Sequence, residues 1–238
     1  MQSMLSIVNK GSAMTFCNQI FGLIPGASHP LRAFMAAVGV VVFISPVFAG
    51  TSTVGEEAAV KTAKSAHVVA EEVKNDLVAV IRKKKELEAE GGEEKYFKAI
   101  EGVLLPVVDF KYIARGVMGQ YGKQASVDQK QRFAINFQQG LVTTYAKGLA
   151  GYGNHQISVV PPKDSEADKK SQSVVLQVKG GDTMNVLAFT MKLNRSQEWK
   201  LTNMILNGIN LGKTFRNQFA QSMKKNNDLD AVIDGWSN

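Results

Sequence analysis

The sequence predicts an α+β fold in which helices pack on one face of a four-stranded antiparallel sheet. As far as Gly153, apolar residues recur every three or four positions, which is the period of an amphipathic helix. After Gly153 they recur at every second position, which is the period of a strand with one buried face. Because the strands share one apolar face, the helices are expected to cover it.

The first 49 residues are predicted to be a secretory signal peptide with an N-terminal extension. They contain no Asp or Glu, and they end in the apolar run 33–49, which follows Arg32. This order of charged, apolar and small residues is typical of a signal peptide, with a retained membrane anchor and a transit peptide as alternatives. We expect cleavage after Ala49, which removes the only cysteine, Cys17, and leaves a single domain over residues 50–238.

Two helices are expected at the start of this domain. Residues 56–89 carry a thin apolar seam whose members are alternately four and three positions apart, and the glycine pair 91–92 ends this helix. The next helix covers residues 93–105 and is closed by Pro106.

The segment 109–122 predicts a third helix that is unusual because it is apolar on nearly all sides. It contains Gly116 and Gly119, and each interior glycine costs a helix about 1 kcal/mol relative to alanine. The two glycines therefore indicate a close approach by a neighbouring backbone or by a ligand.

A capping box marks the start of the fourth helix, since Ser126 and Gln129 stand three residues apart. This helix should end at the glycines of residues 151–153. Its broad apolar face is formed at four-residue spacing by Phe133, Phe137, Leu141, Tyr145 and Leu149.

Four strands are expected next, and two further helices close the chain. Turn residues separate the strands, notably at 180–182 and 194–198. The strands are predicted over residues 157–159, 174–178, 187–193 and 199–205. In the closing helices, Phe215, Phe219 and Met223 mark the first apolar face, and Asp228 is expected to cap the second.

The sequence offers little for catalysis, metal binding or nucleic-acid binding. No common catalytic or nucleotide-binding motif is present around His67 and His155 or elsewhere in the sequence. The formal net charge is +7, but the basic residues are interleaved with acidic ones, which does not favour nucleic acid as a partner. We therefore expect no enzyme, no cofactor and no metal site.

The apolar surface facing inward allows two interpretations. The helical faces and the sheet face either fill one another, as protein interiors usually do, or enclose a space. The pattern of residues alone leaves both possibilities open.

A resemblance to a known family favours the second possibility, an enclosed space. The chain resembles the MlaC family of periplasmic phospholipid carriers, also called the toluene-tolerance family, from about Tyr96 to Phe219. The resemblance is carried by Leu104-Leu105-Pro106, Asp109-Phe110, Ala114-Arg115, Val117-Met118-Gly119, Gln129, Arg132-Phe133, Thr144-Tyr145-Ala146 and the segment 207–211. The chain departs from the family pattern at Gly122, where tryptophan is usual, and at Asn203 and Asn207, where acidic residues are usual.

The resemblance implies a soluble carrier that holds a phospholipid by its acyl tails between the helices and a curved sheet. It implies a location in the periplasm of a Gram-negative bacterium and transfer between an inner-membrane lipid ABC transporter complex and an outer-membrane lipoprotein complex. Such transfer would maintain the lipid asymmetry of the outer membrane. A monomer is expected.

On this hypothesis the cavity wall is built from apolar residues of the helices and the sheet, and Arg115 is a candidate for contact with the headgroup phosphate. The expected wall consists of Leu105, Val108, Tyr112, Ile113, Val117, Phe133, Phe137, Leu141, Leu176, Leu187, Phe189, Met191 and Leu201. The alternatives are a carrier of another apolar lipid such as a hopanoid, a small enzyme that uses Asp109 or Tyr112, and an adaptor with a solid core.

Overall fold

The computed structural model describes residues 64–162 and 170–236, so the predicted signal peptide lies outside the described residues. The helices are α2 (Ala66–Arg82), α3 (Lys84–Leu104), α4 (Phe110–Met118), α5 (Val127–Leu149), α6 (Leu211–Asn226) and α7 (Leu229–Asp234), with short 3-10 turns at Tyr121–Lys123 and Ala150–Tyr152. The strands are β1 (Gln156–Val159), β2 (Ser171–Gly180), β3 (Thr183–Leu193), β4 (Trp199–Leu206) and β5 (Ile209–Asn210).

The strands form one antiparallel meander in the order β1-β2-β3-β4-β5. The predicted α+β class is confirmed, with five strands instead of four because the two residues of β5 pair with the end of β4. The other end of β4 is covered by the segment before α4, where the Leu201 N–H donates to the Val107 carbonyl at 2.8 Å. Both contacts protect an edge that would otherwise expose unpaired backbone groups.

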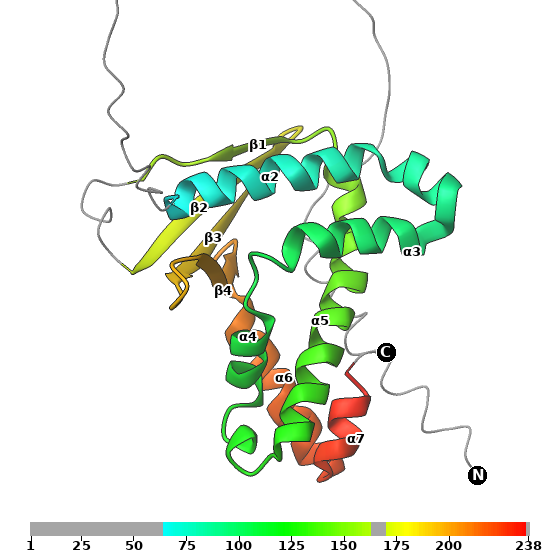
Figure 1. Ribbon diagram of the computed structural model, residues 1–238, viewed down its shortest axis with the longest axis vertical. Helices are drawn as coiled ribbons and strands as arrows, with labels where there is room; N and C mark the ends of the chain where they lie inside the picture. The colour runs from blue at the N-terminus through cyan, green and yellow to red at the C-terminus, as the bar shows by residue number, and fades with distance from the viewer. Residues whose placement is uncertain (1–63, 163–169, 237–238) are drawn as a thin grey trace, which may run out of the picture.

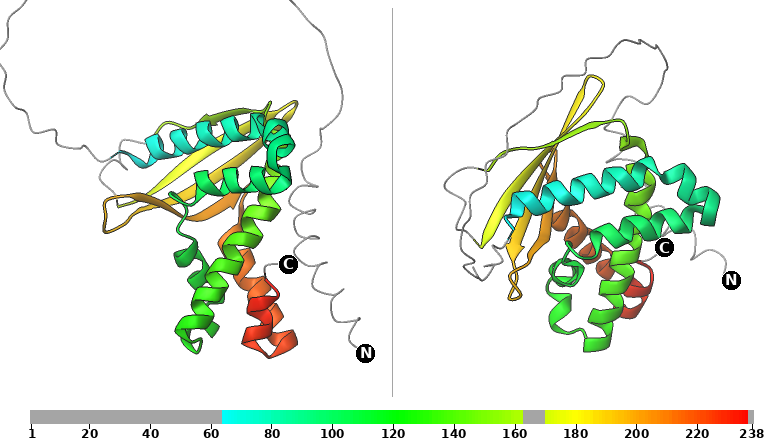
Figure 2. Two further views of the ribbon diagram at one scale, coloured as in Figure 1. Left: turned by 45° about the vertical axis from the view of Figure 1, so that its right-hand side comes forward. Right: turned by 45° about the horizontal axis from the view of Figure 1, so that its top comes forward.

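The helices form two groups (Figure 1). Helix α2 lies along one face of the sheet, and α3 returns beside it. Helices α4, α6 and α7 extend away from the sheet as a bundle, and α5 belongs to both groups because it runs from this bundle up to α3 (Figure 2). Among the described residues, no helix has the length and apolar character needed to cross a membrane.

Two of the predicted helix boundaries are wrong, and the one at residues 91–92 is confirmed. The first helix begins at Ala66 because the Ser65 side chain caps it by accepting from the Val68 N–H, so it does not run unbroken from residue 56. At residues 91–92 both glycines have non-helical backbone angles, so a kink separates two helical stretches within α3 where the sequence predicts a helix end. Helix α4 ends at Met118, before the expected end of the third helix.

Three separate apolar clusters take the place of one continuous core. The bundle cluster joins α4, α5, α6 and α7, the sheet cluster joins α2 to β2, β3 and β4, and the upper cluster joins α2, α3 and α5. In the upper cluster the Tyr96 hydroxyl donates to the Ala146 carbonyl at 3.1 Å. Burial, together with the nearby Glu88 carboxylate, raises the pKa of Tyr96 to about 12, so this donor stays protonated.

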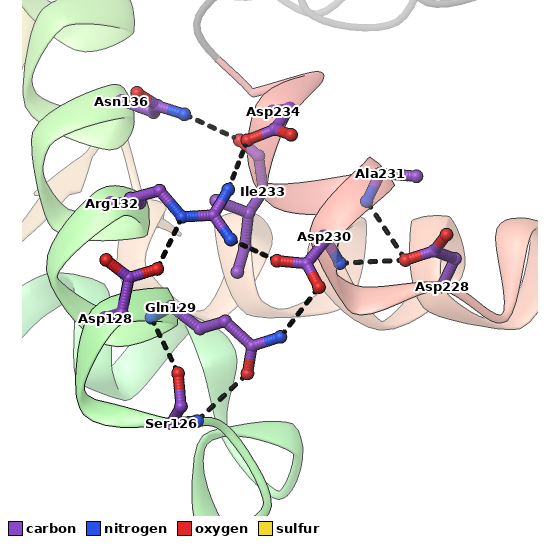
Figure 3. Close-up of polar contacts among 10 residues, drawn as sticks. All are labelled: Ser126, Asp128, Gln129, Arg132, Asn136, Asp228, Asp230, Ala231, Ile233 and Asp234. Carbon is purple, nitrogen blue, oxygen red and sulfur yellow. Dashed lines mark hydrogen bonds and ion pairs between the residues drawn. The ribbon is translucent and has the colours of Figure 1, made fainter.

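Polar contacts hold α7 against the start of α5 (Figure 3). The predicted capping box is present, with the Gln129 N–H donating to Ser126 Oγ at 3.0 Å and the Ser126 N–H donating to Gln129 Oε1 at 2.9 Å. One turn later the Arg132 guanidinium pairs with Asp128 of its own helix and with Asp230 and Asp234 of α7. These contacts fix the two helices relative to each other.

The two glycines of the third predicted helix have different roles. Gly119 ends α4 at φ 54° and ψ −124°, a conformation that only glycine adopts without strain. A Cβ at Gly119 would also lie 2.7 Å from Arg216 Nε. Gly116 is interior to α4, but a Cβ there would meet nothing within 4 Å, so the expected close approach at Gly116 is wrong.

Gly119→Ala should lower the free energy of unfolding by about 1–3 kcal/mol because the backbone must hold a strained conformation. Gly116→Ala is the matched control and should raise it by about 0.5–1 kcal/mol, since alanine is the better helix former and the space is open. Urea unfolding of both variants measures this difference. Equal effects of the two substitutions would contradict the assignment.

Acid should weaken the docking of α7. Hydrogen bonds from Gln129 and Arg132 lower the pKa of Asp230 below its ordinary value of 3.8. The carboxylate therefore stabilises the fold above pH 3.8, and this contribution is lost as the pH falls through the lower pKa of the folded state. Urea midpoints at pH 7 and pH 3 should differ less in Arg132→Met than in the unsubstituted protein.

The control for this comparison is Arg195→Met, which removes the same charge from the exposed turn between β3 and β4. Its pH dependence should match that of the unsubstituted protein. An Arg132→Met protein with an unchanged pH dependence would show that this ion-pair network does not stabilise the fold.

Candidate functional site

A cavity of about 300 Å³ lies between the inner face of the sheet and the helices. The sheet supplies Ile157, Leu176, Val178, Asn185, Leu187, Phe189, Met191, Leu201, Asn203, Met204 and Leu206. Helices and their connections supply Ala70, Val73, Lys74, Leu77, Val78, Ile81, Leu104, Val107, Val108, Phe110, Ile113, Leu141, Val142, Tyr145, Leu149, Tyr152, Leu211, Gly212 and Phe215. A filled core is therefore excluded, because this space is many times what one water molecule needs.

The cavity is elongated along the strands. On β3 its wall extends from Asn185 to Met191, a distance of six residue steps or roughly 20 Å at about 3.3 Å per step. Asn185 and Met191 are buried at the two ends, whereas Leu187 and Phe189 between them remain partly exposed. The middle of the inner face thus lacks the close cover that its two ends have.

A β-bulge lies in the part of the sheet that faces the cavity. Phe189 pairs with Met204 and Met191 pairs with Leu201, so β4 has one more residue than β3 between these pairs. Leu201 and Met204 both reach the wall, although residues three apart on a regular strand face opposite sides. Asn203, within the irregular stretch, also lines the cavity and accepts from the Gly212 N–H at 3.3 Å.

The hollow exists because the three apolar clusters meet around it without merging. Leu176 and Met191 belong to the sheet cluster, Ile81 to the upper cluster, and Leu141 and Phe215 pack against the bundle cluster. Each of these side chains contacts its own cluster on one side and the cavity on the other. The helices pack on one another and therefore cannot collapse onto the sheet.

Few polar groups interrupt this wall, and among its described residues no Asp or Glu is present. Lys74 forms an ion pair with Glu71, so its alkyl stem lies at the cavity while its charge is neutralised by a partner on the same helix. Burial raises the pKa of Tyr152, which keeps this phenol neutral. The cavity thus suits hydrocarbon better than an ion.

The structure brings together most of the residues predicted for the wall. Helices and the segment before α4 contribute three of them, and the sheet contributes the remainder. Those on the cavity wall are Val108, Ile113, Leu141, Leu176, Leu187, Phe189, Met191 and Leu201.

Five residues predicted for the wall lie elsewhere. Val117, Phe133 and Phe137 are buried in the bundle cluster, where the Phe133 and Phe219 rings meet at 4.9 Å between centroids. Leu105 is 45% exposed and Tyr112 is 41% exposed. These assignments need correction because spacing identifies a shared helix face but does not identify the neighbour of each turn.

Arg115, predicted to contact a headgroup, is exposed and does not belong to the cavity wall. Its guanidinium carbon lies 6.0 Å from the centre of the Tyr112 ring. Lys192 approaches the same ring at 4.9 Å and donates to the Tyr112 hydroxyl at 2.9 Å. A role for Arg115 in headgroup binding stays a prediction.

Several wall residues were not among those predicted. Ala70, Val73 and Leu77 belong to the apolar seam of the first predicted helix, so the seam itself was the signal that could have found them. Met204 and Leu206 gave no such signal, because alternation from Leu201 points to residues 203 and 205. Tyr152 follows α5 in a 3-10 turn that the sequence does not distinguish from a simple helix end.

The residues considered for chemistry are not arranged as a catalytic set. Asp109 caps α4 by accepting from the Tyr112 N–H at 2.8 Å, and its own N–H donates to the Leu201 carbonyl at 3.0 Å. The His155 ring lies against Tyr152, with 4.7 Å between centroids. Within residues 64–162 and 170–236, no three His, Cys, Asp or Glu side chains are grouped as metal ligands.

Comparison with known proteins gives related sequences over most of the chain. A family model described as MlaC protein matches residues 71–238. The toluene tolerance protein ttg2D of Pseudomonas putida is 36% identical over 178 residues, covering 74% of this chain and 81% of that protein. The intermembrane phospholipid transport system binding protein MlaC of Haemophilus influenzae is 28% identical over 111 residues, covering 45% of this chain and 51% of that protein.

A solved structure has a similar fold. It is the phospholipid-binding protein of Ralstonia solanacearum, determined in complex with a phospholipid. The two folds agree with a TM-score of 0.66 at 24% sequence identity, over 73% of this chain and 95% of that chain. At this level of identity the similarity establishes the fold alone.

Proposed function

Because this chain belongs to the MlaC protein family, we propose that it is a non-enzymatic, phospholipid-binding carrier. The observation that carries the proposal is the apolar cavity of about 300 Å³ between the helices and the inner face of the sheet. The bound phospholipid of the Ralstonia solanacearum protein, which shares this fold, supports the same ligand class.

The energetics of a carrier favour burial of the acyl tails over tight binding of the headgroup. Exposing two chains of sixteen carbons to water would cost on the order of 20 kcal/mol at about 0.8 kcal/mol per methylene. A carrier must therefore hide nearly all of this hydrocarbon. Because a bilayer and an apolar cavity are similar environments, transfer between them is close to balanced, which suits exchange at two membranes.

We further propose that the chain is exported to the periplasm of a Gram-negative bacterium after removal of residues 1–49, and that residues 50–238 form one monomeric lipid-binding domain. It would pass phospholipid between an inner-membrane lipid ABC transporter complex and an outer-membrane lipoprotein complex, which would maintain lipid asymmetry. The name of the Haemophilus influenzae relative, an intermembrane phospholipid transport system binding protein, supports such a role. Any energy input would come from the partner complexes.

The alternatives differ in what supports them. Nothing in the cavity supports an enzyme that uses Asp109 or Tyr112. Asp109 serves as a helix cap, and neither residue lines the cavity. A carrier of a polycyclic lipid such as a hopanoid would use the same apolar wall. Identification of the bound lipid separates this carrier from a phospholipid carrier.

The deciding experiment is native mass spectrometry of protein purified without detergent, followed by extraction and identification of the bound lipid. We expect co-purified phospholipid. Protein that emerges without lipid, and that also fails to extract phospholipid from vesicles, would refute the carrier function.

Filling the middle of the cavity should weaken lipid uptake. Leu187→Trp adds bulk to the partly open sheet wall, and a steric cost of about 1–3 kcal/mol corresponds to about a 5- to 150-fold loss of binding. Leu105→Trp is the matched control because Leu105 lies outside the wall and is exposed. The measurement is the amount of phospholipid bound per protein after each variant has been incubated with vesicles. Equal loading of the two variants would argue against this cavity as the binding site.

A further inference from the structure

One polar side chain stands out within the apolar wall. Asn185 lies at one end of the cavity and is only 5% exposed. It pairs with Val178 in the sheet, which in turn pairs with Ile157, so its neighbours on the inner face are apolar. Its Nδ2 atom is buried and has no hydrogen-bond partner among the residues that the structure describes.

The orientation of the Asn185 amide follows from its neighbours. The Val186 N–H donates to Asn207 Oδ1 at 2.8 Å, and because a backbone N–H can only donate, the oxygen of Asn207 must face it. The Asn207 NH2 group then donates to Asn185 Oδ1 at 2.8 Å. Asn185 must present its oxygen to Asn207, so its NH2 group is the part of this wall residue that is left without a protein partner.

Asn207 is held firmly enough to impose this orientation. Asn207 and Gly208 have φ angles of 48° and 84° and form the two-residue turn between β4 and β5, as expected for an Asn-Gly hairpin. The Asn207 N–H also donates to the Val186 carbonyl at 2.9 Å. Backbone and side chain of Asn207 are thus both tied to β3.

We propose that the NH2 group of Asn185 donates a hydrogen bond to an acceptor oxygen of the lipid inside the cavity, and that Asn207 is the positioning residue for this donor. The inference rests on the proposed carrier function. A buried donor stays unpaired beside pure hydrocarbon, whereas an ester carbonyl or a hydroxyl on an acyl chain would satisfy it. The site therefore selects lipids that carry an oxygen acceptor next to their hydrocarbon.

A competition experiment tests this selection. The protein without its proposed signal peptide, residues 50–238, is incubated with vesicles. The vesicles contain equal amounts of an ester-linked and an ether-linked phospholipid with the same headgroup and saturated chains. A second arm pairs the ester lipid with a counterpart that carries one hydroxylated chain. Native mass spectrometry counts each bound species, and the arm that shows a preference identifies the source of the acceptor.

We expect the unsubstituted protein to favour the lipid with the better acceptor by about fivefold in at least one arm, the effect of one neutral hydrogen bond. Asn185→Leu should still load lipid but lose the preference. Lipid bound without preference in either arm, or a preference that survives Asn185→Leu, would overturn the inference alone. Failure to take up any lipid would overturn the carrier function as well.

Asn207→Asp provides a second variant outside the cavity, at an exposed turn. The introduced carboxylate has no N–H, so Asn185 must turn its NH2 group toward it and its oxygen toward the cavity. The preference should fall as in Asn185→Leu, although the cavity wall keeps its residues. Asn226→Asp adds the same charge at the exposed end of α6 and should leave the preference intact.

Discussion

The fold depends on one constraint, which is that the apolar inner face of the sheet must be covered by helices that are already packed on one another. Helix α2 packs on β1 and β2 and is backed by α3, while α4 and α6 contact β4 and form a bundle with α7. Side chains of the sheet therefore meet side chains of two helical groups that cannot approach further. Apolar surface would normally close to crystal-like density, and here the geometry of the helices prevents it.

Contacts remote from the cavity maintain this arrangement. Helix α5 contributes Phe133 and Phe137 to the bundle at one end and Leu141 and Tyr145 to the cavity further along, so the position of its second half follows from the packing of its first. The ion pairs of Arg132 fix α7 against the same helix (Figure 3). Part of the stability is thus provided by residues such as Phe133, Phe137 and Arg132, which do not line the cavity.

The sequence revealed the elements and their apolar faces more fully than their contacts. Alternation identified Leu187, Phe189 and Met191 as one face of a strand because period two has a single geometric meaning. The four-residue spacing from Phe133 to Leu149 also identified one face, but a helix 23 residues long meets different neighbours at each turn. The bulge that brings Met204 to the wall shifts the register between β3 and β4 by one residue. The order of apolar residues in the sequence does not predict such a shift.

The polar group that the wall presents also depends on contacts between residues far apart in the sequence, which a local sequence pattern does not predict. Asn185 and Asn207 are 22 positions apart, and only the pairing of β3 with β4 brings their amides together. The direction of the Asn185 amide is set through Asn207 by a backbone N–H, so a turn on the surface controls whether the cavity offers a donor or an acceptor. A mostly apolar wall provides affinity that depends on the length of hydrocarbon, and the oriented amide of Asn185 within it adds a requirement for a particular atom. In the proposed carrier, such a cavity would exchange lipid with a bilayer and still discriminate among lipids, because one hydrogen bond changes the preference for a lipid without approaching the energy of its buried tails.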